Sequence, residues 1–189
     1  MQLLFASANP NKVSEIRQLL PAGYELFSLA DIGFTEDIPE TADTIEGNAL
    51  LKMAFMAGRQ EMACFADDTG LVIPSLNGEP GVYSARYAGE AKDANSNMDL
   101  VLRKLETQTD RSAYFVTVIA LWMNGKQHLF EGRVDGTILT EKRGAKGFGY
   151  DPIFQPEGHD RTFAEMTAEE KNSLSHRGRA LEKMVAFLR

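Results

Sequence analysis

Apolar positions follow two different patterns along the chain, short continuous runs and a helical spacing, and together these patterns predict an α/β protein. Short apolar runs predict strands over 3–6, 25–29 and 62–66. Apolar residues at every third or fourth position predict helices over 11–20, 44–60 and 95–106. The last predicted helix takes its apolar face from Leu181, Met184, Val185 and Leu188.

The second half of the chain adds an expected hairpin. Two long β-rich runs, 113–123 and 127–139, are separated by Asn124-Gly125, a dipeptide that favours a two-residue turn between antiparallel strands. Pro and Gly gather in 74–89 and 144–158, which are expected to be long loops. The expected fold is a mixed sheet with flanking helices, in one domain over 1–189 without a separable linker.

Helix signals stand at both ends of the chain. Pro10 suits the first turn of a helix, where its missing N–H would have had no partner. Thr167 and Glu170 have the spacing of a capping box, and a final helix is expected after Ser175–Gly178.

Composition narrows the class of protein. The chain has 189 residues, of which 43% are hydrophobic and 25% charged, and this is ordinary for a globular domain. The formal net charge of -7 argues against broad binding to a nucleic-acid backbone, although local cations and a metal ion can hold one small phosphate ligand. No apolar stretch reaches the length of a spanning helix, so we expect no membrane partner and a cytoplasmic location. The single cysteine, Cys64, lies in an apolar run and is expected to be a buried strand thiol.

Two sites could carry phosphate chemistry. At Ser7–Lys12 a strand passes into a helix amino terminus that carries free N–H groups and a lysine, which suits phosphate, although an ordinary helix cap is the alternative. Glu40 lies in a predicted loop, and Asp67-Asp68 would end a strand directly before Thr69. Carboxylates of this kind can hold Mg²⁺ together with substrate phosphates, or they can cap a turn. Successive strand residues point to opposite faces, so only one of the two aspartates can face such a site.

Two further segments could bind a base. The loop Gly147–Pro152 presents Phe148 between two glycines, where the ring could stack on a base or anchor the loop in the core. His176 and Arg177 can donate hydrogen bonds that a 6-keto purine accepts and an adenine amino group cannot, although His176 could equally be a cap residue. Lys52 and Lys171 could contact phosphate or lie in solvent.

Seven motifs, in order, resemble the inosine triphosphate pyrophosphatase family, whose members remove dITP, ITP and XTP. They are SANPNK at 7–12, ET at 40–41, GNALLK at 47–52, FADDTGL at 65–71, GEPGVYSARYAG at 78–89, GFGYDPIF at 147–154 and EEKNSLSHRG at 169–178. The resemblance covers nearly the whole chain. It implies a hydrolase with a two-lobed α/β fold on a long mixed sheet, a cleft between the lobes, a homodimer and dependence on Mg²⁺.

The resemblance also assigns roles to residues. Glu40 and Asp68 would bind Mg²⁺, and Asp68 would also be the catalytic proton acceptor. The substrate would be bound by Ser7, Ala8, Asn9, Pro10, Asn11, Lys12, Lys52, Thr69, Phe148, Gly149, Tyr150, Asp151, Lys171, His176 and Arg177. Many relatives have a glutamate where this chain has Gly47, with Glu46 one residue earlier, so the role of Glu46 stays open. The role of Asp67 also stays open, between a direct role and a turn cap.

The expected activity is hydrolysis of non-standard purine nucleoside triphosphates to the monophosphate and pyrophosphate. Two alternatives remain. One is a pyrophosphatase for modified pyrimidine or methylated guanine triphosphates, and the other is a nucleotide sensor without catalysis.

Overall fold

The computed structural model describes residues 1–189, which form two compact units. Unit 1 comprises Met1–Asp68, Thr117–Gly132 and Arg177–Arg189, and unit 2 comprises Thr69–Val116 and Arg133–His176. One six-stranded sheet runs through the chain in the order β2-β1-β3-β4-β5-β6. The mixed α/β fold expected from the sequence is therefore confirmed.

Most elements begin and end within a few residues of their predicted positions. The strands are β1 (Gln2–Phe5), β2 (Glu25–Ser28), β3 (Ala63–Val72), β4 (Ser112–Met123), β5 (Lys126–Ile138) and β6 (Phe154–Pro156). The α-helices are α1 (Pro10–Leu19), α2 (Ile45–Ala57), α3 (Ala94–Lys104), α4 (Ala168–Leu174) and α5 (His176–Leu188). The 3₁₀ turns are η1 (Pro74–Leu76), η2 (Gly81–Arg86), η3 (Asp151–Ile153) and η4 (Phe163–Glu165).

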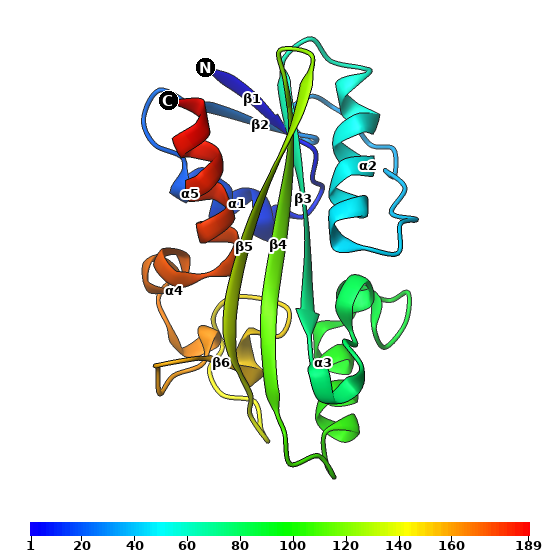
Figure 1. Ribbon diagram of the computed structural model, residues 1–189, viewed down its shortest axis with the longest axis vertical. Helices are drawn as coiled ribbons and strands as arrows, with labels where there is room; N and C mark the ends of the chain where they lie inside the picture. The colour runs from blue at the N-terminus through cyan, green and yellow to red at the C-terminus, as the bar shows by residue number, and fades with distance from the viewer. The chain divides into compact units, whose positions relative to one another are not determined.

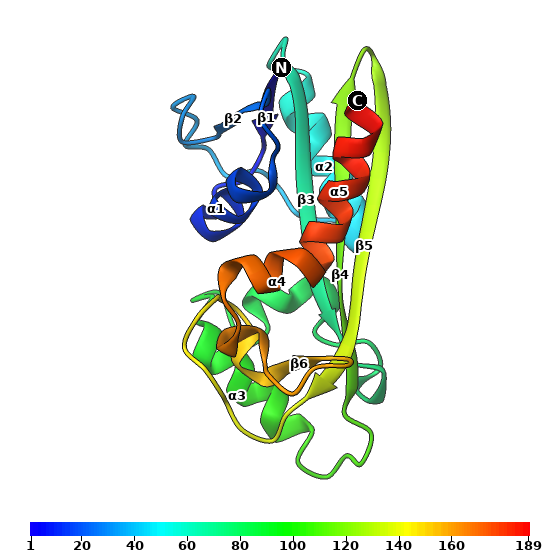
Figure 2. The same ribbon diagram turned by 90° about the vertical axis from the view of Figure 1, so that its left-hand side faces the viewer.

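Unit 1 has helices on both faces of its part of the sheet (Figures 1 and 2). β1 lies between β2 and β3 and is parallel to both. Leu3 and Phe5 of β1 pack in a core with α1 and α5, whereas Leu4 and Ala6 pack in a second core with α2. The alternation of side chains along one strand therefore supplies both cores, and the same alternation decides which helix each residue of β3 faces.

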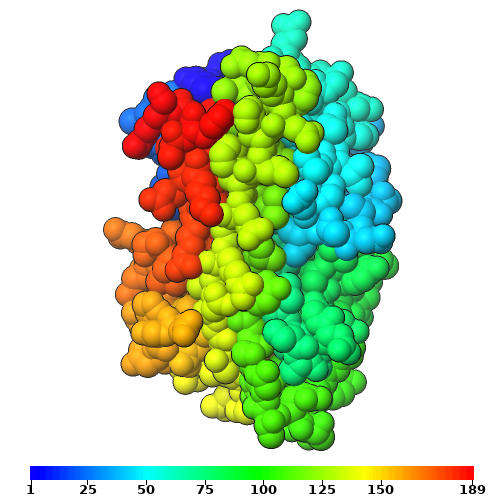
Figure 3. Space-filling view, in the orientation of Figure 1, coloured from blue at the N-terminus to red at the C-terminus, as the bar shows by residue number.

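The predicted hairpin is confirmed at Asn124-Gly125. Both residues have positive φ, 53° at Asn124 and 74° at Gly125, as the tight turn between β4 and β5 requires. In the space-filling view of Figure 3, this hairpin is at the surface between the red α5 and the cyan α2.

Unit 2 has a core of its own. Leu71 of β3, Val101 of α3, Phe115 of β4 and Ile138 of β5 are all buried in it. β6 pairs antiparallel with β5. The expected long loops exist, but they contain the 3₁₀ turns η1, η2 and η3 as well as β6.

The helix starts follow from local chemistry. Pro10 is at the beginning of α1, Thr44 caps α2, and Thr167 and Glu170 form the expected capping box of α4. One prediction was wrong: His176, Arg177 and Gly178 do not precede the last helix but form its first turn. Ser175 is the extended residue that ends α4, and α5 begins directly after it. None of the helices combines the length and the apolar character needed to cross a membrane.

Candidate functional site

The acidic pair lies inside a strand rather than at its end, so the prediction of a strand ending at Ala66 was wrong. β3 continues through Asp67, Asp68, Thr69 and Gly70 to Val72. The strand continues because Leu71 and the following Ile73 are buried in the core of unit 2. The alternative of a turn cap at Thr69-Gly70 is therefore also wrong.

The two aspartates point to opposite faces of β3, as strand geometry predicts. Asp67 bonds to residues of α1 and α5, and Asp68 bonds to a residue of α2. Each aspartate therefore belongs to a different group of side chains in unit 1.

The Asp68 group is centred on Lys52. The Lys52 ammonium donates to Glu40 at 2.5 Å and to Asp68 at 3.3 Å, so one cation brings the two predicted metal ligands together. Lys52 is 8% exposed and Asp68 is 9% exposed, which excludes the alternative of a solvated lysine. Burial raises the pKa of Asp68, and the charge of Lys52 opposes this without reversing it. Burial by itself would lower the pKa of Lys52, but its carboxylate neighbours, Asp68 foremost, raise it.

The Asp67 group contains two cations. Asp67 accepts from the Lys12 ammonium at 2.9 Å and from Arg177 Nε at 3.1 Å. Arg177 also donates to Glu15, on the same helix as Lys12. Burial would raise the pKa of Asp67, but Lys12 and Arg177 outweigh burial and hold that pKa below its usual range. Arg177, predicted to contact the base, thus has its guanidinium bound to two carboxylates of unit 1.

The loop at Ser7–Lys12 forms a more self-contained cap than the sequence suggested. Asn9 Oδ1 accepts the N–H groups of Asn11 and Lys12, and the N–H of Asn9 donates to Ser7 Oγ. The expectation of free N–H groups was therefore wrong for Asn11 and Lys12, because Asn9 satisfies them. Ala8 and Pro10 are exposed beside this cap.

Glu40 is held near Lys52 by a residue that the sequence analysis missed. Asn48 of α2 is buried, and its Oδ1 accepts the N–H of Ala42 at 3.0 Å, which fixes the loop after Glu40. A Cβ on Gly47 would lie 2.7 Å from that of Ala42, so this close approach needs glycine. Glu46 is exposed. The available signal was an asparagine among apolar helix positions, one turn from Lys52.

Glu15 was also missed. It lies three residues after Lys12 on α1 and therefore shares its face of the helix. Nothing in that spacing reveals the partner, because Arg177 is 162 residues further along the chain.

Unit 2 gathers a second group around Lys171. The Lys171 ammonium bonds to Asp151 at 2.7 Å and lies 4.6 Å from the centre of the Phe148 ring. The N–H of Phe148 donates to the same Asp151 oxygen at 2.9 Å. Lys171 is 4% exposed, so it is not a surface lysine. A Cβ on Gly147 would lie 2.0 Å from the Asp151 carboxylate, and the loop therefore needs glycine there.

The other predicted residues of unit 2 divide between surface and core. Phe148 and Gly149 are partly exposed, and Phe148 does not anchor the core. That anchor is Tyr150, which is 5% exposed and donates its hydroxyl to the Ser84 carbonyl at 2.7 Å. His176 is buried and stacks on Phe115 with ring centres 4.6 Å apart.

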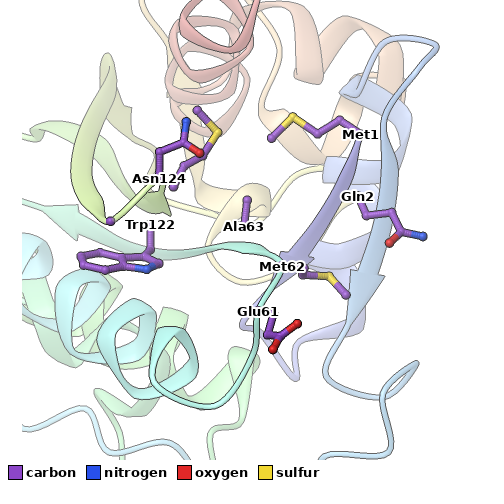
Figure 4. A pocket seen from close by; sticks show the side chains of 9 residues that line it. Met1, Gln2, Glu61, Met62, Ala63, Trp122 and Asn124 are labelled. Carbon is purple, nitrogen blue, oxygen red and sulfur yellow. The ribbon is translucent and has the colours of Figure 1, made fainter.

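Two pockets lie elsewhere. One, of about 510 Å³, is lined by Met1, Met62 and Trp122 among others, where β1 begins and the β4–β5 hairpin turns (Figure 4). The other, of about 410 Å³, lies against β5 and β6 in unit 2. No predicted site residue lines either pocket, so neither is the predicted site.

Comparison with known proteins identifies the family. The sequence pattern of the Ham1 family matches residues 3–187. A dITP/XTP pyrophosphatase of Flavobacterium psychrophilum is 54% identical over 189 residues, which is the full length of both chains. A dITP/XTP pyrophosphatase of Bacillus subtilis is 46% identical over 99% of this chain and 96% of its own.

A solved structure agrees with this. The structure of the Staphylococcus aureus Ham1 protein has a TM-score of 0.90 at 40% identity, and the match covers 100% of this chain and 98% of that one. The resemblance drawn from the seven motifs is confirmed, and the chain belongs to the Ham1 family.

Proposed function

We propose that the protein hydrolyses non-standard purine nucleoside triphosphates, namely ITP, dITP and XTP, to the monophosphate and pyrophosphate. Its membership of the Ham1 family supports this, as do the full-length relatives named dITP/XTP pyrophosphatase. The removal of such nucleotides from the nucleotide pool follows from that reaction.

The observation that carries the proposal is the convergence of Glu40 and Asp68 on Lys52, with Lys12 fixed on the neighbouring Asp67. A triphosphate is a dense anion that needs several fixed cations, and two lysines of unit 1 would supply them. Ser7–Lys12 would contribute its loop to the same phosphates. Thr69, next to Asp68 on β3, would contact substrate as well.

Glu40 and Asp68 fit a magnesium ion. Both offer hard carboxylate oxygens, and Mg²⁺ typically takes one or two carboxylates together with water and substrate phosphates. Their shared bond to the Lys52 ammonium supports the fit, since both carboxylates already face one cation. Bound there, Mg²⁺ would neutralise charge on the phosphate chain.

Asp68 would act as the general base. A water molecule attacks the α-phosphorus, the bond from that phosphorus to the bridging oxygen breaks, pyrophosphate leaves, and the water proton passes to the Asp68 carboxylate. The burial that raises the pKa of Asp68 makes its carboxylate a stronger base than an exposed one. Lys52 would orient that carboxylate through their bond.

The Lys171 group would bind the purine. Phe148 would stack on the ring, and donors such as Lys171, His176 and Arg177 would read its edge. A 6-keto oxygen accepts a hydrogen bond and the adenine 6-amino group does not, so a site built from donors would reject ATP. Asp151 and the backbone of Gly149–Tyr150 would position this loop, because Asp151 bonds to both Lys171 and the N–H of Phe148.

We further propose that the protein is a cytoplasmic homodimer, on the strength of the family resemblance and its composition. Light scattering would measure the oligomeric state, and cell fractionation would measure the location. A monomer, or recovery in the membrane fraction, would contradict the corresponding proposal.

The test is pyrophosphate release from ITP, dITP, XTP, GTP, ATP, dUTP and dTTP with Mg²⁺, measured beside Asp68→Asn. Asp135→Asn, which changes a half-exposed carboxylate paired with Arg133, is the matched control. We expect the wild type and the Asp135→Asn control to turn over ITP, dITP and XTP rapidly with Mg²⁺. This turnover should be lost in Asp68→Asn, and it should be lost in the wild type when a chelator removes the Mg²⁺. Turnover of pyrimidine triphosphates alone would favour the pyrimidine alternative, and tight binding of ITP without turnover would favour the sensor.

A further inference from the structure

No step of the reaction proposed above is assigned to Asp67, although it is one of the most enclosed charges in unit 1. It is 1% exposed and lies in the middle of β3. Its Oδ1 accepts from the Lys12 ammonium at 2.9 Å, and its Oδ2 accepts from Arg177 Nε at 3.1 Å. The carboxylate therefore joins α1 to the first turn of α5.

These bonds argue against Asp67 as a metal ligand. Both of its oxygens already bond to protein cations, Oδ1 to Lys12 and Oδ2 to Arg177, whereas the bond from Lys52 to Asp68 uses Oδ1 alone. Asp67 also faces α1 and α5, whereas Asp68 bonds to Lys52 on the α2 side of the strand. A carboxylate in this position binds Lys12 and Arg177, and it does not face an ion held by Glu40 and Asp68.

The bond to Asp67 fixes the position of the Lys12 ammonium. A lysine side chain is long and flexible, and ordering it on a ligand costs rotamer entropy. Asp67 holds the ammonium in one place before any ligand arrives. A lysine ammonium has three N–H donors, so it can keep its bond to Asp67 and still donate to a phosphate oxygen.

We propose that Asp67 is a positioning residue, which fixes the Lys12 ammonium for the triphosphate and takes no part in metal binding. The inference rests on the proposed function, because it assumes that Lys12 contacts the triphosphate. Arg177 holds the second oxygen of Asp67, and Glu15 in turn bonds to Arg177, so the carboxylate cannot turn away from Lys12 without breaking a buried ion pair.

The experiment separates phosphate binding from metal binding in Asp67→Asn. Binding of inorganic tripolyphosphate is measured by calorimetry, and the Mg²⁺ concentration for half-maximal hydrolysis of ITP is measured by pyrophosphate release. We expect tripolyphosphate to bind about tenfold more weakly, which is the scale of one lost charge-assisted hydrogen bond. The Mg²⁺ requirement should change by less than about twofold.

A double-mutant cycle shows whether Asp67 acts through Lys12. Lys12→Met weakens tripolyphosphate binding, and adding Asp67→Asn to it should cause no further loss, because the ammonium to be positioned is gone. The double variant removes one charge of each sign, so it stays folded more readily than Asp67→Asn, which leaves the partly buried Lys12 and the buried Arg177 without the Asp67 charge. Asp31→Asn is the matched control, since Asp31 also pairs with α1, through Arg17, but in an exposed ion pair.

The outcomes distinguish this inference from the proposed function. An equal loss from Asp67→Asn with and without Lys12 would mean that Asp67 only stabilises the fold. A raised Mg²⁺ requirement in Asp67→Asn would make it a metal ligand. Either result overturns the inference while the activity stands. A wild-type protein that neither hydrolyses ITP nor binds tripolyphosphate would overturn both.

Discussion

Replacing Lys171 by methionine should destabilise the protein strongly, because it removes one partner of a buried ion pair. Lys171 is 4% exposed and Asp151 is 3% exposed, and the ammonium and the carboxylate are 2.7 Å apart. Methionine fills similar space without the charge. The Asp151 carboxylate would keep its bond from the Phe148 N–H but would lose its bonded cation.

The magnitude follows from the burial. Removal of one partner from a buried pair costs about 3–5 kcal/mol in the free energy of unfolding. A chain of this length loses about 2–4 °C of melting temperature per kcal/mol, so the expected decrease is about 6–20 °C. The pair Lys104–Glu79 offers a matched control in the same unit, since its side chains are 41% and 49% exposed. Lys104→Met should cost no more than about 1 kcal/mol.

Urea unfolding followed by circular dichroism, together with calorimetry, measures these differences. A second variant tests the cause: Lys171→Met with Asp151→Asn removes both charges, and the amide oxygen can still accept the Phe148 N–H. We expect the double variant to recover most of the loss. A cost below about 1 kcal/mol for Lys171→Met, or a double variant no more stable than the single one, would refute the reasoning from buried charge.

Three further predictions concern other parts of the chain. The hydrogen bond from Arg161 is the chief reason that the pKa of Glu170 is lowered from 4.5 to about 2. The ionised Glu170 therefore stabilises the fold above pH 4.5, and this stabilisation is lost as the pH falls toward 2. Glu170→Gln should flatten the acid side of a plot of stability against pH. Burial raises the pKa of the Cys64 thiol to about 11, so a thiol reagent near neutral pH should label it only after denaturation, and rapid labelling of the native protein would contradict its burial. Gly47→Ala places a Cβ 2.7 Å from that of Ala42, and this overpacking should cost about 1–3 kcal/mol. The cost should outweigh the gain in helix propensity of about 1 kcal/mol, so we expect a less stable protein in urea unfolding. A variant as stable as the wild type would show that the loop moves aside.

Local chemistry made much of the fold predictable from the sequence. The cap at Thr44, the capping box at Thr167 and Glu170, and the turn at Asn124-Gly125 each depend on residues only a few positions apart. The seven motifs were informative for a different reason, since their order along the chain identified the family before any contact was known.

Sequence reasoning failed where a local signal competed with distant packing. The polar run at Asp67-Asp68, followed by a glycine, resembled the end of a strand. β3 continues because Leu71 is buried in the core of unit 2, which is built from residues as distant as Phe163. Burial of Lys52 and Lys171 was likewise not predictable, since a lysine is buried only where folding supplies a carboxylate.

The sequence by itself therefore determined the type and order of most elements, the family and the residues from which a site could be built. Only the tertiary structure decided which of those residues meet. Asp67 bonds to Lys12 at a separation of 55 residues and to Arg177 at 110, whereas the adjacent Asp68 bonds to Lys52 on the other face of the strand. The physical reason is that strand alternation sends neighbouring side chains to opposite faces, and the helix that packs on each face supplies the partner.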